Sequence, residues 1–151
     1  MKKIDPAAAP RSEGSRYPAP YNEPCKSRRS IRLGDAAGLT QFGVNLLTLD
    51  PGVWSSQRHW HEKEDEFIYV LSGEVVLATD QGEETLRAGD SAGFKAGVRD
   101  GHHLRNETKS AATILVVGTR DDADWGEYSD IDMKFLPSDG GYVRKTGEPI
   151  E

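Results

Sequence analysis

Residues 52–73, GVWSSQRHWHEKEDEFIYVLSG, form the stretch around which the rest of this chain is organised. His59 and His61 are separated by one residue, so in an extended strand their imidazoles point to the same face. Glu66 follows and brings a carboxylate to the same point if it begins the returning strand. Two imidazoles and a carboxylate suit a borderline divalent metal. The alternative is a surface His-x-His pair, which would be the better interpretation if the two histidines stood alone.

A second stretch contains the remaining histidines of the chain, His102 and His103, within residues 89–106, GDSAGFKAGVRDGHHLRN. Together the two stretches resemble the paired sequence motifs of the cupin superfamily. The first motif is matched by Gly52, His59, His61, Glu66 and Gly73, and the second by Gly89, Gly97, His102 and Asn106. The resemblance covers roughly residues 40–118 and implies a small jelly-roll barrel whose histidines and glutamate hold a metal.

The match to the cupin pattern is imperfect in the second motif. Lys95 stands where the pattern has proline, and the segment between Gly97 and His102 is longer than usual. The spacing from glycine to histidine leaves both His102 and His103 open, whereas the spacing from histidine to Asn106 selects His102. Strand alternation also favours His102, because it shares one face with Asn106 while His103 points outward. A bulge at a barrel rim would break this alternation.

The predicted metal ligands are therefore His59, His61, Glu66 and His102. Four such ligands on Mn²⁺ or Fe²⁺ leave two coordination positions open, whereas on Zn²⁺ they can close a tetrahedron. Nickel and copper also accept these ligand types. We expect one divalent ion per chain, with Mn, Fe, Ni or Zn as the candidates.

The same alternation predicts which other side chains face the interior. Gln57 and Asn106 are the expected substrate contacts, although Gln57 could equally orient a metal ligand. Trp54 and Trp60 are expected to point outward. The predicted interior contains no lysine, arginine or tyrosine near the metal, so Lys95 and Arg99 are the nearest candidates for binding a phosphate group.

Most of the chain after residue 30 has the pattern of short strands. Period-two alternation, short apolar runs and closely spaced turns predict an all-β, antiparallel sandwich or barrel, in agreement with the cupin resemblance. The expected strands are 42–47, 53–61, 66–71, 74–79, 83–87, 91–95, 102–108 and 112–117.

The chain is expected to form one domain with two appendages. Prolines punctuate residues 1–30, which predicts an extended or partly disordered N-terminal arm. Residues 31–120 form the predicted barrel. Residues 121–151 form a C-terminal tail, interpreted either as a lid over the barrel mouth or as a segment that packs on the barrel or on a partner.

Composition restricts the class of partner. The chain has 151 residues and a net charge of −6, which disfavours a nucleic-acid or anionic-membrane binder. Cys25 is the only cysteine, and neither a secretory signal nor a membrane-spanning run is evident, so we expect a cytoplasmic protein. The resemblance to cupins of this size implies a homodimer, and we expect a homodimer here.

The cupin resemblance is less informative about activity. Relatives among small bacterial cupins include isomerases, dioxygenases, decarboxylases and lyases, and some are provisionally labelled sugar-phosphate isomerases. One hypothesis is a metal-dependent enzyme, such as an isomerase or dioxygenase, acting on a small sugar- or carboxylate-like substrate. The other is a non-catalytic metal- or ligand-binding module, because a fold alone does not determine function.

Overall fold

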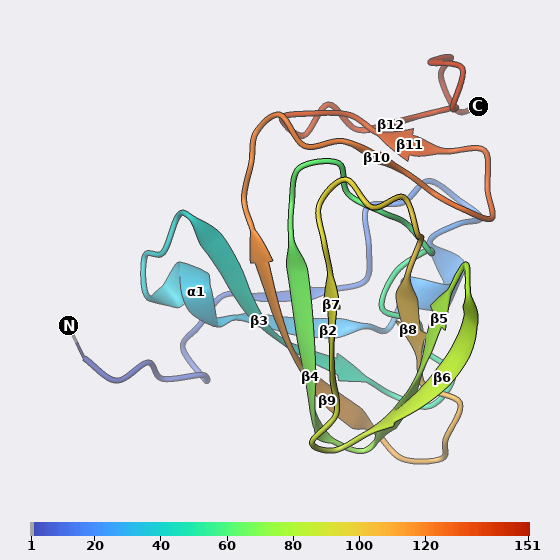
Figure 1. Cartoon of the computed structure of the whole chain (residues 1–151). Coiled ribbons are helices and arrows are strands. Elements are labelled where there is room, and N and C mark those ends of the chain that lie inside the picture. The colour runs from blue at the N-terminus through green and yellow to red at the C-terminus, as the bar shows by residue number, and fades with distance from the viewer. Residues whose placement is uncertain (1) are drawn as a thin grey trace.

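The computed structural model describes residues 2–151 and consists almost entirely of antiparallel strands. One sheet has six strands in the order β1-β2-β3-β9-β4-β7. Their bounds are Arg11–Glu13 (β1), Arg29–Arg32 (β2), Phe42–Leu49 (β3), Ala112–Thr119 (β9), Glu66–Ser72 (β4) and Ser91–Phe94 (β7). A second sheet, in the order β6-β5-β8, contains Gly82–Arg87 (β6), Glu74–Thr79 (β5) and His103–Arg105 (β8). The two sheets face each other (Figure 1).

A third, small sheet lies across one end of the other two (Figure 1). It contains Gly126–Glu127 (β10), Lys134–Phe135 (β11) and Tyr142–Val143 (β12). The helices are the 3-10 turn Glu23–Cys25 (η1) and the single turn Leu33–Ala36 (α1). None of the helices within residues 2–151 has the length and apolar character needed to cross a bilayer.

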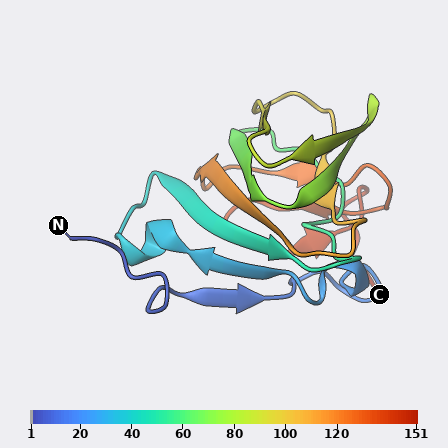
Figure 2. The same cartoon turned by 90° about the horizontal axis from the view of Figure 1, so that it is seen from below.

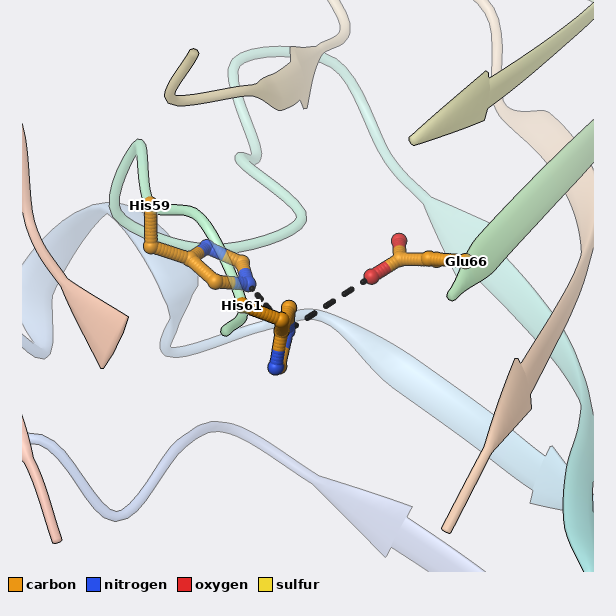
Figure 3. A group of neighbouring side chains, drawn as sticks. All are labelled: His59, His61 and Glu66. Carbon is orange, nitrogen blue, oxygen red and sulfur yellow. Dashed lines mark hydrogen bonds and ion pairs between the residues drawn. The ribbon is translucent and has the colours of Figure 1, made fainter. Parts of the chain in front are cut away.

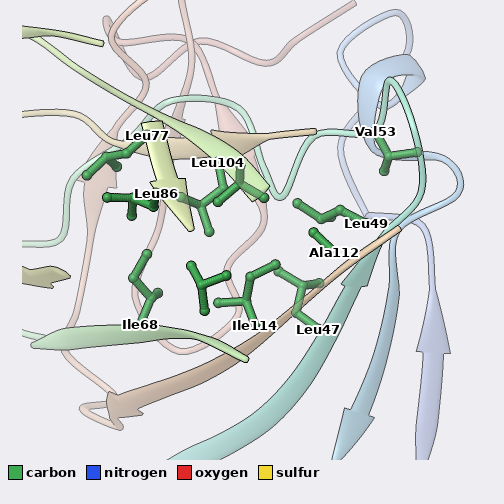
Figure 4. Close-up of a cluster of buried hydrophobic side chains, with 11 residues drawn as sticks. Leu47, Leu49, Val53, Ile68, Leu77, Leu86, Leu104, Ala112 and Ile114 are labelled. Atoms are coloured by element: carbon green, nitrogen blue, oxygen red, sulfur yellow. The ribbon is translucent and has the colours of Figure 1, made fainter. Parts of the chain in front are cut away.

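The core fills the space between the two larger sheets (Figure 4). Along β4 the alternation is clear, because Ile68 and Val70 are buried while Phe67 and Tyr69 are exposed. Ile114 on β9 is fully buried in the same cluster. Burying one such aliphatic side chain contributes roughly 1.5–3 kcal/mol, which ties the sheets together.

The turn between β4 and β5 requires the glycine that ends the first stretch. Gly73 has a φ of +78°, and a Cβ there would lie 2.7 Å from the carbonyl oxygen of Ala111. Both the backbone angle and the lack of space therefore exclude a larger residue. The strand before Gly73 (β4) and the antiparallel hairpin after it (β5 with β6) confirm the strands expected over 66–71, 74–79 and 83–87.

Residues 53–61 are the main departure from the expected strands, because they form no regular strand in the structure. Isolated bridges join Trp54 to Arg105 and His59 to His102. The expected strand over 102–108, which contains the other histidine pair, is shorter than predicted, since β8 covers only His103–Arg105. The prediction of an extended strand over 53–61 was wrong, although the bridges still fix the backbone near both histidine pairs.

The N-terminal arm packs along the edge of the six-stranded sheet, which is clear from below (Figure 2). β1 pairs with β2, and β2 pairs with β3 over Arg29–Arg32, so the expected boundary at residue 30 falls inside a strand. Between them, Cys25 is fully buried. The backbone N–H of Trp54 donates to the carbonyl of Pro24, which joins the arm to the irregular segment.

Candidate metal centre

His59 and His61 converge at the centre of the candidate site (Figure 3). Their Nε2 atoms are 3.0 Å apart. The Nδ1 of His59 lies 2.8 Å from the carbonyl oxygen of Gln57, and the Nδ1 of His61 lies 2.6 Å from Oδ2 of Asp124. Because a carbonyl or carboxylate only accepts, each Nδ1 must carry the proton, which leaves both Nε2 lone pairs directed at the site.

The separation of the two nitrogens fits one bound cation. Two lone pairs 3.0 Å apart repel each other unless a positive charge lies between them. Imidazole nitrogens sit about 2.0–2.1 Å from a metal such as Zn²⁺, so two of them at a right angle on one ion lie about 3 Å apart. The geometry of His59 and His61 therefore matches a shared metal ion.

Glu66 and His102 complete the cluster. Glu66 begins β4, and its Oε2 lies 3.9 Å from Nε2 of His61 and 3.5 Å from Nε2 of His102. His102 is 4% exposed, and within residues 2–151 neither of its ring nitrogens has a hydrogen-bond partner. A buried imidazole without partners is costly, and coordination of an ion would satisfy it. The ring is held in place by Phe94, which stacks on it at 3.6 Å.

The protonation states also suit metal ligands. Burial lowers the pKa of His59 to about 3, so this imidazole is neutral at neutral pH. Burial alone would raise the pKa of Glu66, but the neighbouring His102 and the other imidazoles lower it to about 2, so the carboxylate is ionised. The residues present thus fit a divalent ion, and the ligand atoms of His59, His61 and Glu66 lie within 4.8 Å of one another.

Asp124 is a site residue that the sequence did not reveal. Its side chain is 6% exposed, accepts the Nδ1–H of His61 and also accepts the backbone N–H of Lys63 at 2.8 Å. Burial alone would lower the pKa of His61, but the hydrogen bond and charge of Asp124 raise it. Asp124 lies in the expected C-terminal tail, and only the fold brings it against His61, which is 63 positions earlier in the chain.

His103 was expected to be an exposed residue, and that expectation was wrong. Its side chain is 3% exposed, packs edge-on against Trp54 at 4.8 Å and donates from Nδ1 to the carbonyl oxygen of Ser56 at 2.9 Å. The ring therefore lies against the irregular segment and not among the metal ligands. Trp60 was also expected to face outward, but it is 6% exposed and packs on Trp125.

The two expected substrate contacts have their side-chain amides engaged with the protein. Asn106 is fully buried, donates to the carbonyls of Leu49 and Ser110 and accepts two hydrogen bonds from Thr108. We assign it a structural role in that turn in place of the expected substrate contact. Gln57 donates from Nε2 to the carbonyl of Tyr21 at 2.7 Å, so its amide nitrogen holds the arm.

A cavity of about 230 Å³, called the central cavity below, adjoins the cluster. His59, Glu66 and His102 line one part of it, and apolar side chains such as Ile68 and Val116 line another. The N-terminal arm contributes Tyr17 and Arg28. The expectation that no arginine or tyrosine lies near the ligands was therefore wrong, because the strand pattern took no account of the arm.

The C-terminal sheet covers the other side of the histidines. The ring of Tyr128 lies 5.6 Å from that of His59, and the ring of Phe135 lies 5.2 Å from that of His61. Residues 121–151, expected to be a lid or a segment that packs on the barrel, thus place two aromatic rings against the histidines of the cluster.

Comparison with known proteins identifies a family that agrees with the fold and the ligand motifs. Residues 45–118 match the cupin domain family Cupin_2. No curated protein sequence matches the chain at a significant level. The chain is similar to the crystal structure of a sugar phosphate isomerase of the cupin superfamily from Silicibacter pomeroyi, with 47% identity, a TM-score of 0.94 and coverage of 99% of this chain and 97% of that one.

Two further structures are more distant. A protein from Acidithiobacillus ferrooxidans, provisionally named a sugar phosphate isomerase, is 29% identical with a TM-score of 0.75, and the match covers 83% of this chain and 81% of that one. A polyketide cyclase from Streptomyces resistomycificus, at 24% identity and a TM-score of 0.63 over 80% of each chain, shares the fold alone. On the strength of the ligand motifs, the antiparallel fold and the extent of the match to the Silicibacter protein, this chain belongs to the cupin superfamily.

Proposed function

We propose that this protein is a metal-dependent isomerase that acts on a small sugar-like substrate. The observation that carries the proposal is the convergence of His59, His61, Glu66 and His102 beside the central cavity. The names of the two sugar phosphate isomerases similar to this chain support the choice of reaction. The cavity volume of about 230 Å³ suits a substrate smaller than a typical drug-sized ligand.

The four side chains would hold one divalent ion, with Mn, Fe, Ni or Zn as candidates. When bound, such an ion supplies a Lewis acid that polarises a carbonyl or hydroxyl oxygen of the substrate. The neutral imidazole of His59 and the ionised carboxylate of Glu66 are already in the protonation states that metal ligands need. Asp124 orients His61 by holding its Nδ1 proton, so that Nε2 stays directed at the ion.

An isomerase reaction also fits the lining of the central cavity. Moving a carbonyl group between neighbouring carbons transfers hydrogen within one molecule and needs no oxidant, reductant or second substrate. Phe94, Ile68 and Val116 give the cavity apolar walls beside the ligands. Such walls exclude water from the transferring proton and strengthen electrostatic interactions with the substrate.

The test combines metal analysis with a search for isomerisation. Protein purified without added metal or chelator should contain about one divalent ion per chain. A panel of aldose and ketose phosphates is then incubated with it in D₂O and followed by NMR. Interconversion of an aldose phosphate and its ketose is the expected result, and it should disappear in Glu66→Gln.

Other outcomes separate the alternatives. Oxygen uptake without isomerisation would indicate a dioxygenase. Ligand-induced stabilisation without turnover would indicate a binding module. Metal content near zero, unchanged in a His59→Ala, His61→Ala double variant, would remove the basis of the proposal.

A further inference from the structure

Among residues 2–151, Arg28 is the one arginine that lines the central cavity. It lies between η1 and β2, and it lines the cavity together with His59, Glu66 and His102. Its Nε donates to the carbonyl of Gly14 at 3.1 Å, and its Nη1 donates to the carbonyl of Ser55. These two bonds hold the guanidinium in a fixed orientation between the arm and the irregular segment.

The charge of Arg28 has no acidic partner in the described part of the chain, residues 2–151. Both of its hydrogen-bond acceptors are neutral carbonyls, and no carboxylate lies within 4.0 Å of it. Arg58, Arg105 and Arg120, by contrast, each pair with at least one acid. A half-buried cation beside a cavity is costly unless an anion neutralises it, so the environment of Arg28 favours an anionic ligand.

Neutral polar groups lie around the same cavity. Tyr17 and Ser30 contribute hydroxyls, and burial raises the pKa of Tyr17, so its hydroxyl stays protonated and can donate. Asn45 contributes an amide whose Oδ1 is buried and has no hydrogen-bond partner within residues 2–151. Oxygen and nitrogen of an amide are assigned from the surrounding bonds, so this group can also present its NH₂ to a ligand.

The balance of charge in the cavity points the same way. Among the described residues that line the central cavity, Glu66 is the single carboxylate. Once Glu66 ligates a divalent ion, the ion and Arg28 leave the cavity with net positive charge. The chain as a whole carries −6, so the cavity is a local exception that would attract a small anion.

We propose that Arg28 binds the anionic group of the substrate, a phosphate or a carboxylate, while oxygens at the other end of the same molecule meet the metal ligands. The inference rests on the proposed function and makes its substrate class specific: a small polyhydroxy or hydroxycarbonyl compound with one terminal anion. It also gives the N-terminal arm a role, since the arm supplies the residue that selects charged substrates over neutral ones.

The test uses inorganic phosphate and acetate as probes of the full-length chain. Calorimetric titrations are carried out on the protein as purified and again after treatment with a chelator, so that binding by Arg28 is separated from binding by the metal. Phosphate should bind both forms. Arg28→Gln should weaken phosphate binding at least about tenfold, because charge-assisted bonds are lost. Arg28→Lys should recover part of the affinity.

Arg29→Gln is the matched control. Arg29 is the adjacent residue and loses the same charge, but it is exposed and pairs with Asp50. The phosphate affinity of the Arg29→Gln variant should stay within about twofold of that of the unaltered chain, since exposed charges act weakly through solvent. The relative affinity for phosphate and acetate in the unaltered chain identifies which anion the site prefers.

Asn45→Asp tests the proposal without disturbing the bonds of Arg28 to the arm. This isosteric change puts a carboxylate into the central cavity, and its negative charge should weaken phosphate binding. The result does not depend on whether Arg28→Gln loosens the arm. Unchanged phosphate affinity in either Arg28→Gln or Asn45→Asp, with the fold intact by circular dichroism, overturns the inference. Metal content measured on the same samples keeps this outcome distinct from a failure of the metal site.

Discussion

Two adjacent histidines with similar burial have different environments in this protein. His102 is 4% exposed and neither of its ring nitrogens has a hydrogen-bond partner within residues 2–151, whereas His103 is 3% exposed and its Nδ1 is bonded to the carbonyl of Ser56. Burial therefore does not distinguish a ligand from a structural residue. The distinction lies in the hydrogen bonds, since His102 retains two free nitrogens beside Glu66.

His102→Ala should lose most of its metal affinity, because it removes a ligand while the remaining ligands stay in place. His103→Ala should keep the metal but cost about 1–3 kcal/mol of stability, because it leaves the carbonyl of Ser56 unpaired and a void beside Trp54. Metal titration and denaturant unfolding of both variants check this. If His103→Ala is the variant that loses metal, the assignment of ligands in this strand is wrong.

Asp124→Asn should weaken metal binding by roughly 10–100-fold and move its pH dependence. The charge of Asp124 raises the pKa of His61, so a metal must displace a proton from His61 and binding weakens as pH falls through that raised pKa. Without this charge the pKa of His61 falls, and the midpoint of the pH dependence should move to lower pH. Metal titrations from about pH 5 to about pH 8 measure both effects. Asp130→Asn, at an ion pair with Arg58, is the control that should change neither.

At the scale of elements, the arm and the irregular segment depend on each other. Residues 53–61 form no regular strand, yet Trp54 and Gln57 bond to the carbonyls of Pro24 and Tyr21 in the arm. Arg28 adds a bond to the carbonyl of Ser55. The arm thus supplies some of the hydrogen bonds that a neighbouring strand would otherwise make to this segment.

The thiol of Cys25 should report on how firmly the arm is held. The side chain is fully buried, and burial raises its pKa to about 11 from an ordinary value of 9.0. A raised pKa keeps the thiol protonated, so near pH 8 the reactive thiolate should be about 100-fold scarcer than for an exposed cysteine, and its fraction grows as pH approaches 11. Reaction with a disulfide reagent should be slower by at least this factor than in unfolded protein.

Gln57→Ala should speed the reaction of Cys25, because it removes the bond from Gln57 to the arm. Gln41→Ala is the control, since Gln41 is exposed and lies outside the arm. Equal reaction rates in native and unfolded protein would show that the arm does not stay on the barrel.

At the scale of the whole molecule, β4 exposes apolar side chains on the outer face of the six-stranded sheet. Phe67, Tyr69 and Leu71 on β4 are 43%, 38% and 46% exposed. β4 lies inside the sheet, between β9 and β7, so these residues form part of a face and not of an edge. A contiguous apolar face of this kind is typical of a protein–protein contact.

We expect this face to form a homodimer. Light scattering at micromolar concentration should give twice the chain mass of 16.6 kDa. Combining Phe67→Glu with Tyr69→Glu should yield monomers, because two buried charges would face each other across the symmetric contact. Val98→Glu, at an exposed apolar residue in the loop after β7, should stay dimeric. A monomer mass for the unaltered chain would contradict the expectation.

The sequence by itself determined the features that depend on neighbouring residues. Alternation in β4 and the turn at Gly73 are local, since side-chain direction and backbone angle depend on adjacent residues. The spacing of His59, His61 and Glu66 was also sufficient to predict three residues that converge. Their meeting, however, does not come from a strand, because isolated bridges and the bond to Asp124 hold the two histidines in place.

Only the tertiary structure decided the surroundings of those ligands. Asp124 comes from the C-terminal tail, Phe94 from β7 and Arg28 from the arm, and each reaches the site through pairings between segments far apart in the chain. Such contacts leave no periodic signal, because the residues involved are neither neighbours in sequence nor on one strand. Which residues can act as metal ligands is thus a local property of the sequence. The orientation and protonation state of each ligand, and the charge of the cavity that it faces, are properties of the fold.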